Sequence, residues 1–155
     1  MSMSLKQTAK TIITENQYMT LGSVGEGGQA WVAPLAYAFD RGYNLYFMSL
    51  PGSRHVKNMM RNPTVSVAIF DSRQGFGEGV GLQLKGEASG VPARSAAVVF
   101  KHYFGRKWPF GNLGNIKDFE KFFRIYKYRF YKVKPVEVWL NDPRKDYDAR
   151  VRVRL

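Results

Sequence analysis

The chain of 155 residues contains no cysteine, which excludes disulfide bonds, thiolate metal ligands and cysteine nucleophiles. It has two histidines, His55 and His102, and neither has acidic residues at the spacing of a metal site, so we expect no bound metal. No run of about 18 apolar residues occurs, and therefore no membrane-spanning helix is predicted. Residues 1–17 also lack the continuous apolar stretch of a secretory signal peptide. These absences predict a soluble, cytoplasmic protein that makes no membrane contact.

Acidic residues are scarce, whereas positive charge and aromatic rings are abundant. The 12 Asp and Glu stand against 24 Lys and Arg, a net charge of +12, and the chain carries 11 Phe, 9 Tyr and 3 Trp. Such a charge attracts phosphate groups or nucleic acid, although a basic protein need have no specific partner. Residues 126–134, YKYRFYKVK, alternate basic and aromatic side chains, which would suit single-stranded nucleic acid. A strand with aromatic residues in the core and cations in water gives the same pattern, and we favour that interpretation over a nucleic-acid partner.

Hydrophobic periodicity predicts a mainly β fold with flanking helices. The connections between the first strands are short turns, so we expect antiparallel pairing and a barrel with helical decoration instead of βαβ units. Residues 1–140 are expected to form one domain, and the basic residues 141–155 a loosely held C-terminal tail. The predicted helices are residues 4–17, 53–61, 92–104 and 116–126, and the predicted strands are residues 18–24, 29–39, 43–49, 64–71, 82–91 and, as one or two strands, 126–140.

A phosphate site is predicted in the segment FMSLPGSRHVKNMMRNP, residues 47–63. Ser53 occupies the expected N-cap of the helix, where its hydroxyl can accept a hydrogen bond from a first-turn N–H. A helix N-terminus attracts anions, and Arg54, His55 and Lys57 add donors and positive charge. An ordinary capped helix on the surface of a basic protein would contain the same residues, and the segment alone does not separate the two interpretations.

Two further motifs carry less weight. The loop GFGEGVG, residues 75–81, joins two predicted strands and lacks the Gly-Lys-Ser/Thr ending of a P-loop, so we interpret it as a flexible connector. Nothing in the sequence around His55 or His102 supports a Ser-His-Asp triad.

Four segments follow one another in a characteristic order. They are LGSVGEGGQAWVAPLAYAF (21–39), YFMSLPGSRH (46–55), VSVAIFD (65–71) after a helix ending at Asn62-Pro63, and LQLKGEASGV (82–91). Their order and spacing resemble the FMN-binding split barrel family, which includes pyridoxamine 5′-phosphate oxidase. The resemblance covers residues 15–91 and continues more weakly through residue 140.

The resemblance implies a six-stranded antiparallel split β-barrel that forms a homodimer, with FMN in a groove at the dimer interface. It also implies a flavin-dependent oxidoreductase. In the family, a serine-arginine-lysine segment holds the FMN phosphate, the second strand lies along the isoalloxazine ring, and a polar side chain from a later strand approaches the ring. The cofactor-binding residues implied in this chain are Val32, Ala33, Pro34, Leu35, Ser49, Ser53, Arg54, His55, Lys57 and Gln83.

The sequence departs from pyridoxamine 5′-phosphate oxidase at several matching positions. Ala33 and Ala38 replace an arginine and a lysine, Gly81 replaces a glutamine, and His55 replaces the lysine of the phosphate segment. The C-terminal arginine and histidine of that oxidase have no clear counterpart in residues 136–148. The resemblance therefore implies a related flavoprotein whose small-molecule redox substrate is unknown and differs from pyridoxamine phosphate.

The loop after the third predicted helix would cover such a groove. The candidate substrate contacts are Lys101, His102, Tyr103, Arg106, Lys107 and Trp108. No side chain has an evident catalytic role in the sequence. Three alternatives stay open: a haem-binding split barrel with His55 or His102 as the axial ligand, a split barrel with a deazaflavin in place of FMN, and a nucleic-acid-binding module.

Overall fold

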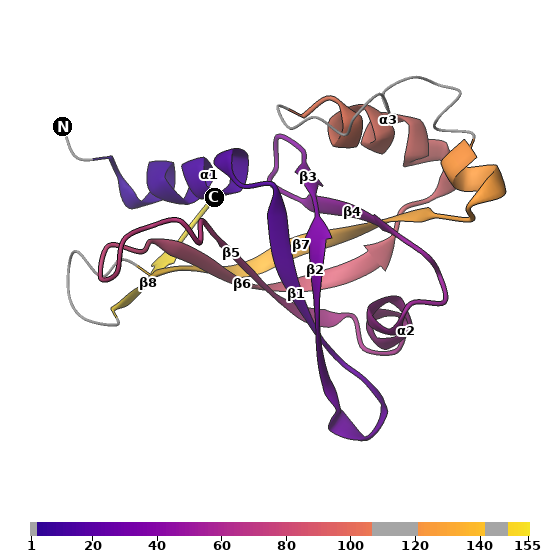
Figure 1. Cartoon of the computed structure of the whole chain (residues 1–155), viewed down its shortest axis with the longest axis horizontal. Helices are drawn as coiled ribbons and strands as arrows, with labels where there is room; N and C mark the ends of the chain where they lie inside the picture. Colours follow the sequence, from indigo (N-terminus) through magenta and orange to yellow (C-terminus); the bar gives the residue numbers. More distant parts are fainter. Residues whose placement is uncertain (1–2, 107–120, 142–148) are drawn as a thin grey trace.

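In the part of the chain that the structure describes, alternating apolar and polar residues form eight strands that pair into one antiparallel sheet (Figure 1). The computed structural model describes residues 3–106, 121–141 and 149–155. The strands are β1 (Tyr18–Val24), β2 (Ala30–Ala36), β3 (Ala38–Phe39), β4 (Leu45–Ser49), β5 (Thr64–Phe70), β6 (Gly81–Gly90), β7 (Arg129–Asn141) and β8 (Arg150–Val153). The helices are α1 (Leu5–Glu15), α2 (Arg54–Arg61) and α3 (Ala93–Phe104), with helical turns η1 (Glu26–Gly28) and η2 (Lys121–Ile125). Within these described ranges, no helix is both long and apolar enough to cross a membrane.

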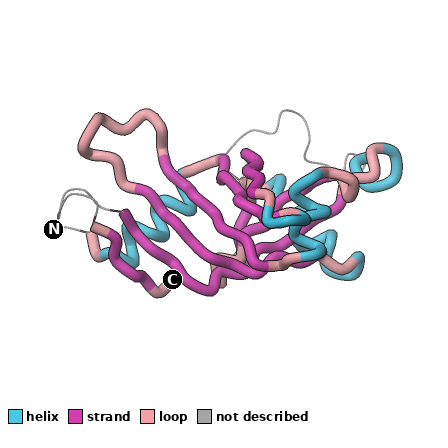
Figure 2. The backbone as a smooth tube through the Cα atoms, turned by 90° about the horizontal axis from the view of Figure 1, so that it is seen from below, coloured by secondary structure: helices cyan, strands magenta, loops and turns pink. Residues whose placement is uncertain are grey.

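The strand order makes the sheet curl into a half-barrel. The order is β2-β1-β5-β6-β7-β4-β3, and β8 pairs with β7. The two ends of this order, β2 and β3, are successive pieces of one segment separated only by Tyr37, so the sheet must bend until its edges approach each other. Figure 2 shows the strands as one curved layer. The bend is accompanied by a register shift between Lys85 and Gly86 in the β6–β7 pair.

Gly86 is required at that bend. A Cβ atom added there would lie 2.5 Å from Val133 Cγ1 and 3.0 Å from the Lys134 carbonyl oxygen, so no side chain fits between the two strands. The absence of a side chain therefore allows β7 to pass close to β6.

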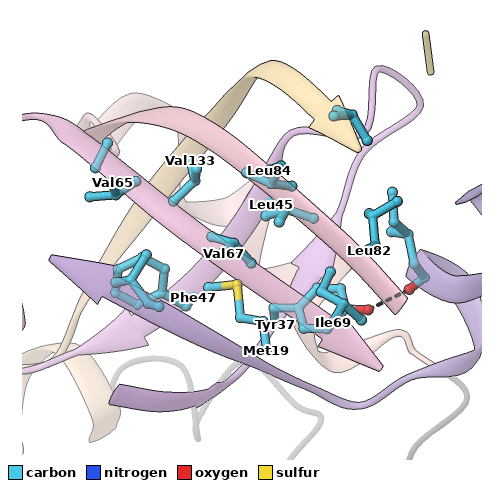
Figure 3. Close-up of a cluster of buried hydrophobic side chains, with 14 of the residues drawn as sticks. Met19, Tyr37, Leu45, Phe47, Val65, Val67, Ile69, Leu82, Leu84 and Val133 are labelled. Atoms are coloured by element: carbon cyan, nitrogen blue, oxygen red, sulfur yellow. Dashed lines mark hydrogen bonds between the residues drawn. The ribbon is translucent and has the colours of Figure 1, made fainter. Parts of the chain in front are cut away.

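The main core fills the concave side of the sheet. Side chains at alternate positions of β5 and β6 point inward, among them Val67, Ile69 and Leu84 (Figure 3). Tyr37 is completely buried in this core, and its hydroxyl donates a hydrogen bond of 2.6 Å to the Ile13 carbonyl of α1. This bond satisfies the polar end of a large core side chain and attaches α1 to the sheet.

A second, smaller core lies under α3. Helical spacing places Ala96, Val99, Phe100 and Tyr103 on one face of α3, where they pack against a group that includes Phe130 of β7. In Figure 1, α1 lies at the upper left and α3 at the upper right of the view, whereas α2 lies lower, on the right. The side chains of β1, β5 and β6 that point away from the main core are mostly exposed or half-buried. We call the face that they form the convex face of the sheet.

The structure corrects several expectations about the elements. Within the described residues the sheet has eight strands where six were expected, because residues 29–39 divide into β2 and β3 and because residues 150–153 add β8. The final predicted segment forms one continuous strand, β7. Part of the expected loose tail is ordered, because β8 pairs with β7 from Val138 to Asn141. The predicted helix 116–126 lies partly outside the described residues, and η2 is its described part.

Candidate functional site

Three predicted phosphate-binding side chains meet at the start of α2. The Ser49 hydroxyl lies 2.9 Å from His55 Nε2 and 3.1 Å from the Ser53 hydroxyl, and Ser53 Oγ lies 3.3 Å from the same ring nitrogen. We call Ser49, Ser53 and His55 the Ser–His cluster. Ser49 ends β4, a Pro-Gly turn follows, and Ser53 and His55 stand at the N-terminal end of the helix. The tight turn brings residues four and six positions apart into hydrogen-bonding contact.

Ser53 occupies the N-cap position but does not act as a capping side chain. Its backbone is extended, with φ −66° and ψ 150°, as is usual for an N-cap residue. The predicted bond from its hydroxyl to a first-turn N–H is absent, because the hydroxyl instead contacts Ser49 and His55. The Ser53 side chain therefore accepts no hydrogen bond from the first-turn N–H groups of α2, and these groups keep the partial positive charge of a helix N-terminus.

His55 is half-buried against an aromatic core residue. Its ring centroid lies 6.1 Å from that of Phe47, and burial lowers the pKa of the imidazole below its usual value of 6.5. The side chain is accordingly neutral at pH 7 and carries one N–H. The Ser–His cluster thus offers hydroxyl and imidazole groups that can donate hydrogen bonds, without a permanent charge of its own.

Arg54 points away from the Ser–His cluster toward the β1–β2 hairpin. Its guanidinium stacks 4.3 Å from the centre of the Trp31 ring, and Nη2 donates a hydrogen bond of 3.0 Å to Gln29 Oε1. Lys57 follows on the same side of the helix, and both residues line a hollow beside the hairpin. The structure therefore divides the predicted phosphate segment into a neutral cluster and a separate row of cations.

The predicted ring-binding strand presents two kinds of side chain. Val32 is 63 % exposed and Pro34 is also exposed, whereas Ala33 is buried and Leu35 packs partly against the main core. Only Val32 and Pro34 can therefore offer side-chain contact to a ligand lying on the outside of the sheet.

Gln83 lies on the same convex face but several strands away. The strand registers pair Pro34 with Thr20, Thr20 with Ala68, and Ala68 with Gln83. Three strand spacings correspond to about 14 Å. Gln83 lines a hollow of about 410 Å³ between the ends of β5 and β6, away from β2. A role for Gln83 at the flavin ring stays a prediction.

Sequence comparison now assigns the family. The model of the pyridoxamine 5′-phosphate oxidase family matches residues 5–142. The chain belongs to this family. No curated protein matches the chain significantly.

Solved structures with the same fold share little sequence with this family member. A haem-binding protein from Mycobacterium smegmatis has a TM-score of 0.76 at 14% identity, covering 99% of this chain and 59% of that one. HutZ, the haem storage protein from Vibrio cholerae, has a TM-score of 0.69 at 18% identity, covering 88% and 94%. An FAD-binding protein from Mesorhizobium loti has a TM-score of 0.65 at 20% identity, covering 89% and 94%. At these identities the likeness establishes the fold alone, and the M. smegmatis protein extends well beyond it.

Two of the positions at which this family member departs from pyridoxamine 5′-phosphate oxidase, Ala33 and Ala38, lie in the protein interior, whereas His55 and Gly81 are partly exposed. Ala38 is completely buried in the second core, and Ala33 is 7% exposed. The arginine and lysine expected from that oxidase are thus replaced by side chains that contribute to packing.

The predicted substrate contacts divide into exposed and structural residues. Lys101 and His102 are exposed on α3. Tyr103 is buried, with its hydroxyl 3.4 Å from the Ala36 carbonyl, and burial raises its pKa to about 12. Lys107 and Trp108 lie outside the described residues.

Arg106 connects the end of α3 to the end of α1. Its guanidinium donates to the carbonyl groups of Asn16 at 2.8 Å, Thr14 at 3.4 Å and Tyr37, and it lies 4.7 Å from the centre of the Tyr37 ring. The carbonyls at a helix C-terminus lack intrahelical donors, and the partly buried Arg106 guanidinium satisfies them here. These bonds occupy Arg106 in the fold, and the expectation that it contacts substrate is not supported by its position.

Sequence reasoning missed four residues beside α2. Glu26, Gln29 and Trp31 reach α2 from the β1–β2 hairpin, and Arg61 occupies its last turn. The spacing of Arg54 and Arg61, two helical turns apart, was the signal available for Arg61. No local pattern indicated that the hairpin would lie against α2.

Proposed function

We propose that this protein binds FMN, with the phosphate at the N-terminus of α2, and acts as a flavin-dependent oxidoreductase. The observation that carries the proposal is the Ser–His cluster: two hydroxyls and an imidazole gather beside a helix N-terminus that Ser53 does not cap. Hydroxyl, imidazole and backbone N–H groups are the donors that a phosphate group requires.

The residues present fit a phosphate monoester. Ser49, Ser53 and His55 are already ordered by contacts with one another, so binding needs little further immobilisation of side chains. Arg54 adds a permanent cation on the first turn of the same helix. Because the Ser–His cluster is uncharged, the fold has no desolvation cost for a charged group there, and the positive end of the helix can stabilise a bound phosphate dianion.

The strand β2 would then support the flavin ring. Val32 and Pro34 face outward from it, and neither carries a group that competes with the ring for hydrogen bonds. When bound, FMN supplies the electron-transfer chemistry, and the chain supplies phosphate binding, orientation of the ring and exclusion of water. Exposed apolar side chains on the convex face, including Tyr18 and Phe70, support the further proposal of a homodimer that covers this face.

The test is flavin binding measured by absorption and fluorescence titration. Wild-type protein should bind FMN more tightly than riboflavin, which differs only in lacking the phosphate. Ser53→Ala should weaken FMN binding at least tenfold, the effect of losing a hydrogen bond of about 1.4 kcal/mol to a charged group, and should leave riboflavin binding unchanged. Ser72→Ala, an exposed serine elsewhere, is the control. Equal affinity for FMN and riboflavin would refute the phosphate assignment.

Haem is the second candidate ligand, because haem-binding proteins share this fold. In this chain His102 is exposed on α3, whereas His55 Nε2 contacts two serines. A haem titration in which wild type sharpens and shifts the Soret band of free haem, and in which His102→Ala does not, would favour haem over FMN. A Soret band that stays that of free haem would remove this candidate.

A further inference from the structure

A second group of cations lies on α2, apart from the Ser–His cluster. Arg54, Lys57 and Arg61 follow at intervals of three and four residues, which places them on one side of the helix. All three line a hollow of about 1030 Å³ between α2 and the tip of the β1–β2 hairpin. Glu26 and Gln29 form part of the opposite wall. We call this space the α2 hollow.

The walls of the α2 hollow are held in place by a buried polar contact. Asn58 is buried, and its side-chain N–H donates a hydrogen bond of 3.1 Å to the Ser23 hydroxyl of β1. A Cβ atom at Gly25 would lie only 2.9 Å from Asn58 Oδ1, so the hairpin needs glycine to approach the helix this closely. The hairpin tip and α2 therefore keep a defined separation, as a binding site requires.

The charges of the α2 hollow are only partly neutralised. Three cations face one carboxylate, which leaves a formal excess of two positive charges. Arg61 Nη1 lies 2.7 Å from Glu26 Oε2, but these side chains are 68% and 86% exposed. An ion pair so exposed contributes little stability, so Arg61 can exchange Glu26 for an anionic ligand at small cost. Glu26 therefore competes only weakly with an anionic ligand for Arg61.

The cations are spread too widely for one phosphate group. Arg54 and Arg61 are separated by seven residues, or about 10 Å along the helix axis. A row of cations matches a row of phosphates, and the excess of two positive charges favours the multiple negative charges of a diphosphate group. We propose that the α2 hollow binds the diphosphate group of a nucleotide, either a free nucleoside diphosphate or the diphosphate of a dinucleotide. The α2 hollow shares Arg54 with the proposed FMN site, so Arg61, which is remote from the Ser–His cluster, is the residue that tests the hollow separately.

Calorimetric titration of the full chain with ADP, pyrophosphate and inorganic phosphate, without magnesium, tests the proposal. ADP and pyrophosphate should each bind at least tenfold more tightly than phosphate. Arg61→Gln should weaken ADP binding at least fivefold, and Glu26→Gln should strengthen it about threefold. The matched controls are Arg73→Gln and Asp71→Asn, because Arg73 and Asp71 form a similar exposed pair, at 2.9 Å, outside the hollow.

Two results would overturn the proposal. If Arg61→Gln and Arg73→Gln weaken ADP binding equally, the attraction comes from net charge and not from the hollow. If phosphate binds as tightly as ADP, no diphosphate site exists. Either result leaves the FMN proposal intact, because Arg61 contacts no residue of the Ser–His cluster in the described structure.

Comparing FAD with FMN identifies the source of the diphosphate. If wild type prefers FAD to FMN and Arg61→Gln removes only that preference, the ligand is a dinucleotide flavin. If FAD and FMN bind equally while ADP binding still requires Arg61, the ligand is a free nucleoside diphosphate. Failure of both flavins to bind would refute the proposed function alone, since the ADP titration reports on the hollow directly.

Discussion

Replacing Arg106 by alanine should destabilise the protein by about 2–4 kcal/mol, an effect far larger than for a residue that serves only substrate binding. The substitution removes hydrogen bonds to the carbonyl groups of Thr14, Asn16 and Tyr37, together with the stacking of the guanidinium on the Tyr37 ring. Hydrogen bonds to a charged group contribute about 1.5–3 kcal/mol each, and a cation–π contact contributes about 0.5–2 kcal/mol. The sum is reduced because burying the guanidinium has a desolvation cost, and because the bond to Thr14 is long.

Urea unfolding at pH 7, followed by circular dichroism, measures this loss. Arg94→Ala is the matched control, since Arg94 is exposed in the first turn of the same helix, and should change the free energy of unfolding by less than about 0.5 kcal/mol. In thermal unfolding, Arg106→Ala should lower the melting temperature by about 5–15 °C, at about 2–4 °C for each kcal/mol. If the two variants unfold at the same urea concentration, Arg106 does not connect α3 to α1, and its assignment to the substrate loop regains support.

Three other predictions follow from the site and the sheet. Arg54→Ala should weaken FMN binding by about 1–3 kcal/mol in a fluorescence titration, and unchanged affinity would show that Arg54 does not contribute to FMN binding. Burial lowers the pKa of His55 below 6.5, so between the folded-state pKa and pH 6.5 the unfolded state binds more protons, and stability should fall as the pH drops through this range. His55→Gln should remove this contribution to the pH dependence of urea unfolding. Identical pH profiles for the variant and wild type would contradict the prediction. Gly86→Ala should lower the free energy of unfolding by about 1–3 kcal/mol, because the added Cβ would clash with Val133. Gly90→Ala is the control, since there is open space around Gly90. Equal losses of stability in the two variants would count against the close approach of β6 and β7.

Local patterns were reliable where a few neighbouring residues decide the conformation. A strand-like run followed by the glycine-rich turn at residues 25–28 predicted a strand at residues 18–24, which is the extent of β1. Pro63 and the amphipathic pattern before it predicted the end of α2 correctly. The resemblance to the split barrel family, stated from motif order, is confirmed by the family match over residues 5–142.

Predictions failed where the outcome depended on a distant segment. Residues 29–39 look like one strand, but the curl of the sheet divides them at Tyr37, so that each part pairs with a different neighbour. Residues 150–153 were expected in a loose tail, yet β7 is long enough to provide them with a pairing edge. In both cases the deciding partner lies far away in the sequence.

The candidate site shows the same division. The sequence predicted that Ser53, Arg54 and His55 form one phosphate site because they are adjacent, and the family resemblance added Ser49. In the structure His55 turns back to Ser49, whereas Arg54 stacks on Trp31. Successive residues of a helix point about 100° apart, so neighbours in sequence face different surroundings once the helix is packed.

The sequence by itself determined the class of fold, the positions of most helices and strands, the positive charge and the family, because periodicity, turn residues and motif order are local properties. Only the tertiary structure decided the eight-stranded curl, the structural role of Arg106 and the separation of the Ser–His cluster from the cations of the α2 hollow. These features depend on which distant surfaces bury each other. Which surfaces bury each other is determined by packing and hydrogen bonding across the whole chain, and no short segment of sequence indicates it.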